Sequence, residues 1–330
     1  MVTTTGCRGE RDVMRLHQIQ ALIASADTGS IRAAARSLGI SQAAVTRALR
    51  DLEQACQIAL LIRGPNGLTF TESGMVMLQH ARLIINQIQQ AQNELAHLRG
   101  EAQGHLCLGV TPWVMMTFLP ETIQEFRKRM PMIRLELYES FATIVYPLLR
   151  SGAMDLVIGH LPSVTEVQEF SCEPLLSCQT AVLTRRGHPR RDCGSIHDLL
   201  DQDWILNFTP AMRQSLLALL FGKFGANIEE ERILNSHSLG MTMAMIEHTD
   251  TCAWGPAIFA QFPFFRDRFI CLSLAEKFDP LELGIITRHG STRSAAATCF
   301  VECLLQVIRR HSRSSKKEDR QIFDTVTFMN

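Results

Sequence analysis

The chain lacks net charge, since its 33 Lys and Arg residues are balanced by 33 Asp and Glu residues. Charge alone therefore does not mark the whole protein as a binder of nucleic acid or of anionic membranes. It also lacks an 18-residue apolar run and an N-terminal secretory segment, so we expect a cytoplasmic protein with no membrane span. A chain of 330 residues suggests two or more domains and easily supports a large core.

Motifs that carry catalysis or bind a cofactor are also missing. The sequence has no G-x-S-x-G, no P-loop, no G-x-G-x-x-G and no H-E-x-x-H. Its ten cysteines form no C-x-x-C pair and no Cys/His spacing typical of a metal site. We therefore expect no enzymatic activity, no metal and no cofactor. Cys172, Cys178 and Cys193 lie in one region and could form a redox switch, although most free cysteines are small buried hydrophobes.

The stretch from Ser30 to Glu53 predicts two short helices separated by a turn. Ser30 is suited to cap the first helix and Ser41 the second, with Gly39 between them. Apolar residues on the second helix recur at i, i+3, i+4 and i+7, which predicts that they pack inward. These residues are Val45, Ala48, Leu49 and Leu52. Two helices joined by a short turn containing Gly are typical of a helix-turn-helix.

The opposite side of the second helix has the chemistry of a DNA contact. Small side chains allow close approach, and guanidinium groups can contact phosphate or guanine. A Gln in the first turn lies where a recognition helix meets base edges. We expect DNA contacts from Ser30, Arg32, Ser41, Gln42, Ala43, Thr46, Arg47, Arg50 and Arg63. A lone helix with two arginines would more simply be an ordinary surface helix, so the neighbouring segments decide between the two interpretations.

Those neighbouring segments favour a DNA-binding domain. Between Met14 and Phe70 the chain has six Arg, three acidic residues and no Lys, which favours bidentate contacts. Short β-like runs at 60–63 and 68–70 flank a Gly-Pro-Asn-Gly turn and predict a hairpin, the wing. Residues 14–70 are therefore expected to form a winged helix-turn-helix.

Residues 14–74 resemble the N-terminal domain of LysR-type transcriptional regulators. The matching positions are Ser30, Ala34-Ala35, Leu38, Ser41-Gln42, Ala44, Val45-Thr46, Leu52-Glu53, Arg63, Leu68-Thr69 and Gly74. The departures are Ala43 for Pro, Cys56-Gln57 for Leu-Gly, Leu61 for Phe, and Asn66 where many members carry a second wing arginine. The resemblance implies a regulator that binds double-stranded DNA, and two-fold symmetry would place it at pseudo-palindromic promoter sites.

The stretch from Thr71 to Arg99 has no Pro and, after Gly74, no Gly, and it predicts one long helix. Its apolar residues alternate spacings of four and three, which is the a/d seam of a coiled coil. They are Met77, Ala81, Ile84, Ile88, Ala91, Leu95 and Leu98. A narrow stripe suits a partner helix better than burial within one domain. We expect a homodimer, and the resemblance implies a second contact that would give a homotetramer.

Beyond a Gly-containing hinge, strands and helices alternate, which predicts an α/β domain with a parallel sheet. Expected strands are 106–110, 133–138, 155–158, 181–183, 204–206, 233–234, 252–254 and 281–286; expected helices are 112–129, 143–150, 211–221, 239–248 and 294–310. This half resembles the LysR effector domain, which is similar to periplasmic solute-binding proteins. The resemblance implies two α/β lobes with a ligand cleft between them.

The resulting fold class is α/β with an N-terminal winged helix-turn-helix, a long linker helix and a two-lobed effector domain. The expected divisions are a disordered arm (1–13), the DNA-binding domain (14–70), the linker helix and hinge (71–104), the effector domain (105–310) and a polar tail (311–330). Lobe I is expected at about 105–165 and 272–310, and lobe II at about 166–271.

An effector site is expected where strands end and helices begin in the two lobes. Ligands of open α/β sheets bind outside the carboxyl ends of strands, and free N–H groups at helix N-termini suit an anion. The candidate residues are Thr111, Pro112, Trp113, Ser140, Phe141, Ala142, His160, Asn207, Thr209, Ser236 and Ser238. They are equally interpretable as ordinary caps and core residues. If they form a site, we expect a small organic acid, aromatic or other, as the effector.

Two functions of different classes fit these patterns. One is a DNA-binding regulator controlled by a small effector or, alternatively, by cysteine oxidation. The other is an α/β enzyme or solute binder that uses its N-terminal helices only to oligomerise. The helix-turn-helix with its wing and linker helix favours the regulator, and salt-dependent retention on heparin or promoter DNA would distinguish the two.

Overall fold

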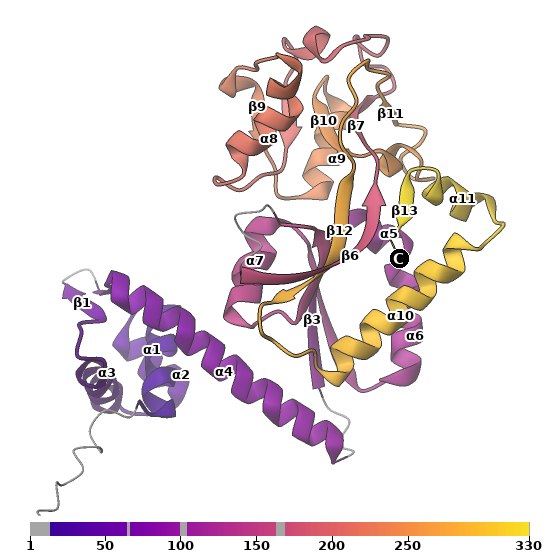
Figure 1. The fold of residues 1–330 in the computed structure, drawn as a ribbon. Coiled ribbons are helices and arrows are strands. Elements are labelled where there is room, and N and C mark those ends of the chain that lie inside the picture. Colours follow the sequence, from indigo (N-terminus) through magenta and orange to yellow (C-terminus); the bar gives the residue numbers. More distant parts are fainter. Residues whose placement is uncertain (1–13, 65–66, 100–103, 163–168, 330) are drawn as a thin grey trace, which may run out of the picture. The chain divides into compact units, whose positions relative to one another are not determined.

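The computed structural model describes residues 14–64, 67–99, 104–162 and 169–329. The chain forms two compact units, divided within one long helix after Gln92 (Figure 1). The arm expected at 1–13 and most of the expected hinge, at 100–103, lie outside the described residues. None of the described helices is long and apolar enough to cross a membrane.

The N-terminal unit is a winged helix-turn-helix followed by a long helix. Its elements are α1 (Leu16–Thr28), α2 (Ile31–Leu38), α3 (Gln42–Cys56), β1 (Leu61–Gly64), β2 (Gly67–Phe70) and α4 (Glu72–Leu98). Both predicted caps are confirmed, because the Ser30 hydroxyl accepts from the Ala33 amide at 3.2 Å and the Ser41 hydroxyl from the Ala44 amide at 3.1 Å. The four apolar residues predicted to face inward on α3 are all buried.

Two residues of the family pattern fix the wing against the helices. One carboxylate oxygen of Glu53, near the end of α3, accepts the amides of Leu60 and Leu61 at 2.9 and 3.0 Å. Gly74, in the first turn of α4, lies so close to the wing that a Cβ there would be 1.9 Å from the Leu60 carbonyl oxygen. Any larger residue at position 74 would therefore push α4 away from β1.

The predicted seam of α4 is buried in its own unit at Ala81 and exposed only further along the helix. Leu78 and Ala81 are buried in the core of the N-terminal unit. Further along, the side chains of Ile84, Ile88 and Leu95 are 37%, 36% and 55% exposed. An apolar stripe left in water on one chain fits the prediction that a second helix covers it.

The C-terminal unit contains two sheets. The larger has the order β13-β6-β12-β5-β3-β4, and the smaller β11-β7-β10-β8-β9 (Figure 1). Strands of the larger sheet are β3 (Gly104–Val110), β4 (Ile133–Glu139), β5 (Leu156–His160), β6 (Phe170–Cys178), β12 (Leu281–Arg288) and β13 (Val326–Phe328). Strands of the smaller are β7 (Thr180–Arg185), β8 (Trp204–Leu206), β9 (Ile233–Asn235), β10 (Cys252–Pro256) and β11 (Phe269–Cys271).

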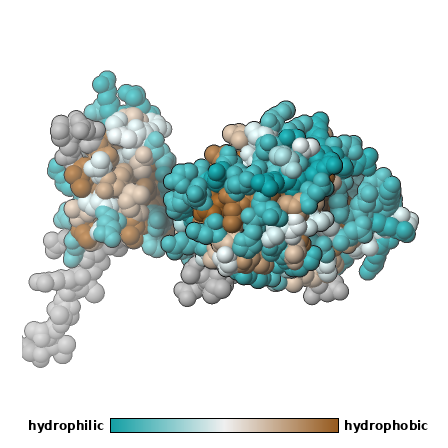
Figure 2. Space-filling model, turned by 90° about the horizontal axis from the view of Figure 1, so that it is seen from above, coloured by the Kyte–Doolittle hydropathy of each residue, from teal (hydrophilic) through white to brown (hydrophobic). Residues whose placement is uncertain are grey.

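Helices connect and cover these strands. They are α5 (Pro112–Thr117), α6 (Leu119–Arg129), α7 (Ala142–Ser151), α8 (Arg213–Leu220), α9 (Leu239–His248), α10 (Ala295–Ser312) and α11 (Lys317–Phe323), with the short 3-10 turns η2 (Ile196–Leu199), η3 (Gly222–Phe224), η4 (Glu230–Arg232) and η5 (Ala257–Ala260). On the face shown in Figure 2, hydrophilic side chains cover most of this unit and apolar patches interrupt them.

Three expectations about this unit were wrong. The sheets are mixed rather than parallel, because β12 returns antiparallel to both β5 and β6. Strand β6 was missed, since Pro174 interrupts its pattern, and it belongs to the larger sheet; lobe II therefore begins after Cys178 rather than near 166. The helix expected at 112–129 is two helices, α5 and α6, which meet at Phe118, just before Leu119-Pro120.

The segment 311–330, expected to be a polar tail, is also folded through residue 329. Its few apolar residues explain this, because Ile322, Phe323 and Phe328 pack on the main core and Val326 is buried within it. Strand β13 pairs antiparallel with the edge of β6, matching Val326 with Cys178. The larger sheet thus gains a sixth strand from the end of the chain.

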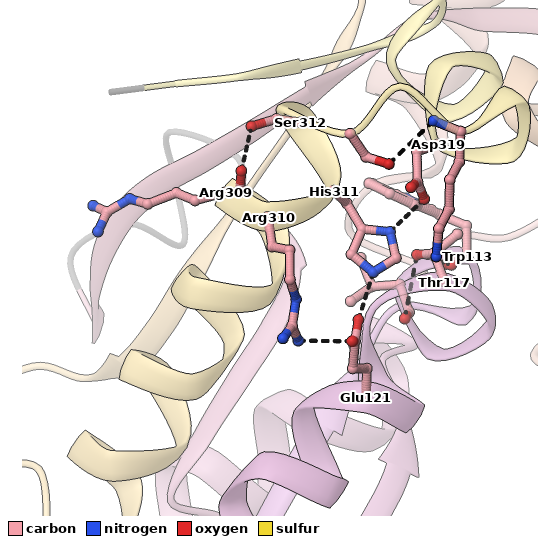
Figure 3. A network of polar contacts seen from close by, with 11 residues as sticks. Trp113, Thr117, Glu121, Arg309, Arg310, His311, Ser312 and Asp319 are labelled. Atoms are coloured by element: carbon pink, nitrogen blue, oxygen red, sulfur yellow. Dashed lines mark hydrogen bonds and ion pairs between the residues drawn. The ribbon is translucent and has the colours of Figure 1, made fainter.

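A histidine connects this segment to the rest of the unit (Figure 3). The two ring nitrogens of His311 lie 2.6 Å from carboxylate oxygens of Asp319 on α11 and Glu121 on α6. Arg310 also pairs with Glu121, at 2.7 Å. Carboxylates accept hydrogen bonds, so the His311 ring connects α10 with both α6 and α11.

Candidate DNA-binding surface and effector cleft

Eight of the nine predicted DNA-contacting residues lie on α2 and α3 or at their N-caps, on the solvent-exposed surface of these helices. Side chains of Arg32, Ser41, Gln42, Ala43, Arg47 and Arg50 are exposed, and those of Ser30 and Thr46 are half-buried. The buried face of α3 holds this surface in place, since Val45, Leu49 and Leu52 are fully buried. A helix anchored on one side thus presents small and guanidinium side chains to solvent on the other.

The arginines of this surface remain available to an external anion. Among the ion pairs of the described residues, none involves Arg32, Arg47 or Arg50. By contrast, Arg82 of α4 pairs with Asp27 of α1. The backbone of Arg63 lies in β1 opposite Leu68. The Arg63 side chain and the whole of Asn66 lie outside what the structure describes.

In lobe I, three predicted site residues meet at the carboxyl edge of the sheet. The Thr111 amide donates to the Ile158 carbonyl at 2.7 Å, and the Ser140 amide to the Val110 carbonyl at 2.9 Å. A Cβ on Gly159 would lie 2.4 Å from the Ser140 hydroxyl, so only a glycine there lets Ser140 lie across the end of β5. His160 is the last residue of that strand.

In lobe II, the loops after β8 and β9 form the corresponding edge. The Ser236 amide donates to the Leu206 carbonyl at 2.8 Å, and the Asn207 side-chain amide donates to the Ser236 carbonyl at 2.5 Å. The Asn207 side chain also lies 3.0 Å from Nδ1 of His237. Ser238 caps α9, its hydroxyl accepting from the Met241 amide at 3.3 Å.

Two contacts bring these edges together across the lobes. The Thr143 hydroxyl of α7 lies 3.2 Å from Nδ1 of His237, and the Leu239 amide donates to Oε2 of Glu139 at 3.4 Å. Residues from near 140 and near 238 are thus brought together, as the predicted cleft requires. Three of these contact residues, Glu139, His237 and Leu239, were missed as site residues from the sequence, since only the fold brings residues that distant in sequence into contact.

Two of the expected helix N-termini differ from the pattern predicted for an anion site. Thr111 starts α5 with Pro112 at the first helical position, but its side chain makes no capping bond and α5 has six residues. Thr209-Pro210 precedes a turn, because α8 begins only at Arg213. The Thr209 hydroxyl accepts from the Met212 amide instead. The N-terminus of α9, with ten residues and a side-chain cap, keeps the predicted arrangement.

Two candidate residues carry buried polar atoms without a partner among the described residues, namely Nε1 of Trp113 and Nδ1 of His160. Trp113 is fully buried and its ring packs edge-on against Phe118, at 6.2 Å between centroids. It therefore lies in the core of lobe I. Burial lowers the pKa of His160 to about 4, so its imidazole is neutral at neutral pH.

The described cysteines are all free. Burial raises the pKa of Cys107, Cys178 and Cys252 to about 12, and also raises the pKa of Cys172 and Cys193. Thiols of this kind are poor nucleophiles at neutral pH. Within the described ranges, no group of His, Cys, Asp and Glu side chains could hold a metal ion.

Together, a winged helix-turn-helix, a long helix and a two-lobed α/β domain define a DNA-binding regulator with an effector-binding domain. Family models match both parts: "Bacterial regulatory helix-turn-helix protein, lysR family" over residues 16–75, and "LysR substrate binding domain" over residues 99–309. The chain belongs to the LysR family of transcriptional regulators, whose members are not enzymes.

Similar proteins carry regulator names. The chain is 24% identical to the HTH-type transcriptional regulator TdcA of Escherichia coli over 83% of its length and 87% of the relative. It is 26% identical to the HTH-type transcriptional regulator GalR of Pseudomonas putida, over 90% of this chain and 75% of that relative. Among solved structures, CbnR is similar with a TM-score of 0.61 at 19% identity, covering 89% of this chain and 99% of CbnR. A full-length OxyR variant of Pseudomonas aeruginosa has a TM-score of 0.59 at 18% identity, covering 90% of this chain and 95% of the OxyR chain.

Proposed function

We propose that the chain binds pseudo-palindromic promoter DNA as a dimer or tetramer and that an organic acid bound between its lobes controls this activity. The DNA-binding part is carried by one observation: the exposed arginines of α3 have no carboxylate partner among the described residues. In a dimer, Gln42, Thr46 and Arg47 would enter the major groove, with Arg63 reaching the adjacent backbone or minor groove from the wing.

Assembly is proposed to use the exposed stripe of α4. Ile84, Ile88 and Leu95 would pack against the same residues of a second chain, so that two recognition helices face one two-fold symmetric site. The full-length CbnR structure has also been determined with its target DNA, and its TM-score with this chain is 0.59. A second contact through the effector domains would make a tetramer.

The effector is proposed to bind in the cleft whose edges Glu139, Thr143, His237 and Leu239 join. Hydroxyl, amide and helix N-terminal groups of both lobes converge there, which suits a small acid, aromatic or other. A ligand that contacts both lobes binds one lobe arrangement more tightly than another. It would thereby shift the arrangement of the DNA-binding units.

Two experiments test this function. Genome-wide mapping of bound DNA should return a two-fold symmetric sequence beside a small set of genes; binding without a shared sequence would reject the regulator proposal. Calorimetric titration of the full chain with aromatic and aliphatic acids should show saturable binding. That binding should weaken in Thr111→Val, Trp113→Ala and Ser238→Ala. Binding that survives all three unchanged would show that the ligand lies elsewhere.

A further inference from the structure

An acidic side chain of the protein already occupies part of the proposed cleft. Glu139 is the last residue of β4 in lobe I, and its Oε2 accepts the amide of Leu239, the first residue of α9 in lobe II. Amides in the first turn of a ten-residue helix carry a partial positive charge and attract anions. The position best suited to an effector carboxylate is therefore next to a carboxylate of the chain itself.

Among the described residues, Glu139 has no ion pair with an Arg or Lys, so the N-terminus of α9 is the positive partner that the structure shows for it. Across the described cleft residues, the hydrogen bonds of Glu139, Thr143, Asn207 and His237 involve no Arg or Lys side chain. His160, the last residue of β5 in the same sheet, is neutral at neutral pH. An effector that brought only a negative charge would therefore meet repulsion from Glu139.

We propose that Glu139 selects an effector that carries an ammonium group beside its carboxylate, such as a small α-amino acid. This inference rests on the proposed effector cleft. The ligand carboxylate takes the amides at the start of α9, including that of Leu239, and its ammonium pairs with the released Glu139 carboxylate. Nδ1 of His160, at the end of β5 and on the far side of β3 from Glu139, is buried without a partner among the described residues.

Matched ligand pairs that differ only in the amino group test the selection. Full-length protein is titrated with L-phenylalanine and 3-phenylpropanoate, L-2-aminobutyrate and butyrate, and L-aspartate and succinate. In wild type, at least one amino acid should bind tenfold or more tightly than its amine-free partner. Glu139→Gln should remove that preference, because it weakens binding of the amino acid and strengthens binding of the plain acid.

Two further variants guard against a structural explanation. Glu136→Gln, on the same strand, removes a carboxylate that bonds to Tyr138 and His105 and should leave the preference unchanged. Glu139→Asp keeps the charge and should retain part of the preference. Circular dichroism and thermal melting check that all variants fold, so a Glu139→Gln protein that does not fold leaves Glu139→Asp as the deciding variant.

The outcomes separate this inference from the proposed function. Plain acids that bind wild type as tightly as their amino partners would overturn the selection by Glu139 and leave the effector cleft standing. The same holds if Glu139→Gln keeps the wild-type preference. Absence of binding by every ligand, up to millimolar concentrations, would overturn the amino-acid inference and also count against the effector cleft.

Discussion

The two units of this chain differ in how their functional surfaces are built. In the N-terminal unit, the DNA-binding surface lies mostly on one helix, α3, whose buried face anchors it and whose other face is exposed. In the C-terminal unit, the proposed cleft depends on residues about a hundred positions apart, as in the contact of Glu139 with Leu239. A single stretch of sequence describes the first surface, whereas only the topology of two sheets creates the second.

This difference predicts how each unit responds to substitution. Changes to a surface on one helix should act singly and leave the fold intact. Changes in the C-terminal unit should act through partners distant in sequence.

The largest effect is expected where the N-terminal unit depends on a second chain. Ile84→Asp combined with Ile88→Asp puts two charges into the proposed seam, and the dimer should dissociate. Affinity for a two-fold symmetric site should fall about 100-fold or more, because one DNA-binding unit no longer holds the other in place. Light scattering and a DNA-binding titration measure both effects.

A charge-matched control tests whether position matters. Gln79→Asp combined with Gln89→Asp places two charges on exposed positions of α4 away from the seam, and mass and affinity should stay close to wild type. An unchanged mass in the Ile84/Ile88 variant would reject the coiled-coil proposal, and a monomeric wild type would reject the assembly.

The next effect concerns the recognition helix. Arg47→Ala should weaken binding to the mapped operator by about 1–3 kcal/mol, or roughly 5- to 150-fold, and relax specificity at one base pair. Arg36→Ala is the control, since this exposed arginine of α2 was not assigned a DNA contact. If both variants lose the same affinity on every sequence, Arg47 contributes only charge.

Local patterns in the sequence predicted the N-terminal unit well. The caps at Ser30 and Ser41 and the inward face of α3 depend on residues within one or two turns, and all are confirmed. The C-terminal unit was predicted only in part. Its α/β class and the return of β12 to the first sheet were correct, but β6, α11 and β13 were missed.

Long-range pairing explains what was missed. Strand β6 is stabilised by β12 and β13, which lie more than a hundred residues later in the chain, and its own sequence contains Pro174. The charge-rich start of α11 hid the few apolar residues that bind this segment to the core. For the same reason the interlobe pair Glu139 and Leu239 could not be found before the fold was known.

The C-terminal segment should show this dependence on distant partners directly. His311→Ala breaks its bonds to Glu121 and Asp319 and should lower the free energy of unfolding by about 1–2 kcal/mol, with faster amide exchange in β13. Arg313→Ala, an exposed neighbour, should have little effect. Unchanged exchange in β13 after His311→Ala would show that apolar packing alone holds the segment.

The same segment should also respond to acid. Burial opposes the charged form of Asp319, but hydrogen bonds from Ser314 and His311 outweigh it and lower the pKa of Asp319. A group with a lowered pKa contributes stability above its unfolded value of about 3.9 and loses it as the pH falls through its folded value. Protection of the β13 amides, corrected for their intrinsic exchange rates, should therefore fall below about pH 4 in wild type, and Asp319→Asn should remove that acid dependence.

A smaller and opposite effect is expected at the end of α3. Gln57 occupies the left-handed region with φ of 54°, which is strained for a residue with a Cβ. Gln57→Gly should raise the free energy of unfolding by about 1 kcal/mol because glycine adopts this conformation without strain. Gly39 has a φ of 67° with open space around it, so Gly39→Ala should lower the free energy of unfolding by a similar amount. Thermal melting measures both, and a destabilised Gln57→Gly variant would contradict this account.

The smallest effect is expected from oxidation, which tests the alternative that the C-terminal unit senses redox state. Cys172 and Cys178 lie six residues apart on one strand, so their Cα atoms are roughly 20 Å apart. A disulfide needs a Cα separation below about 7 Å, and this pair cannot form one while β6 is intact. For Cys178 and Cys193, burial raises both pKa values, and at a pKa of about 12 roughly one Cys178 thiol in 10⁵ is ionised at pH 7.

Treatment with hydrogen peroxide should therefore leave DNA affinity unchanged and produce no intramolecular bridge by mass spectrometry. A bridge that forms at low peroxide and is abolished by Cys178→Ser, together with altered DNA binding, would restore the redox alternative.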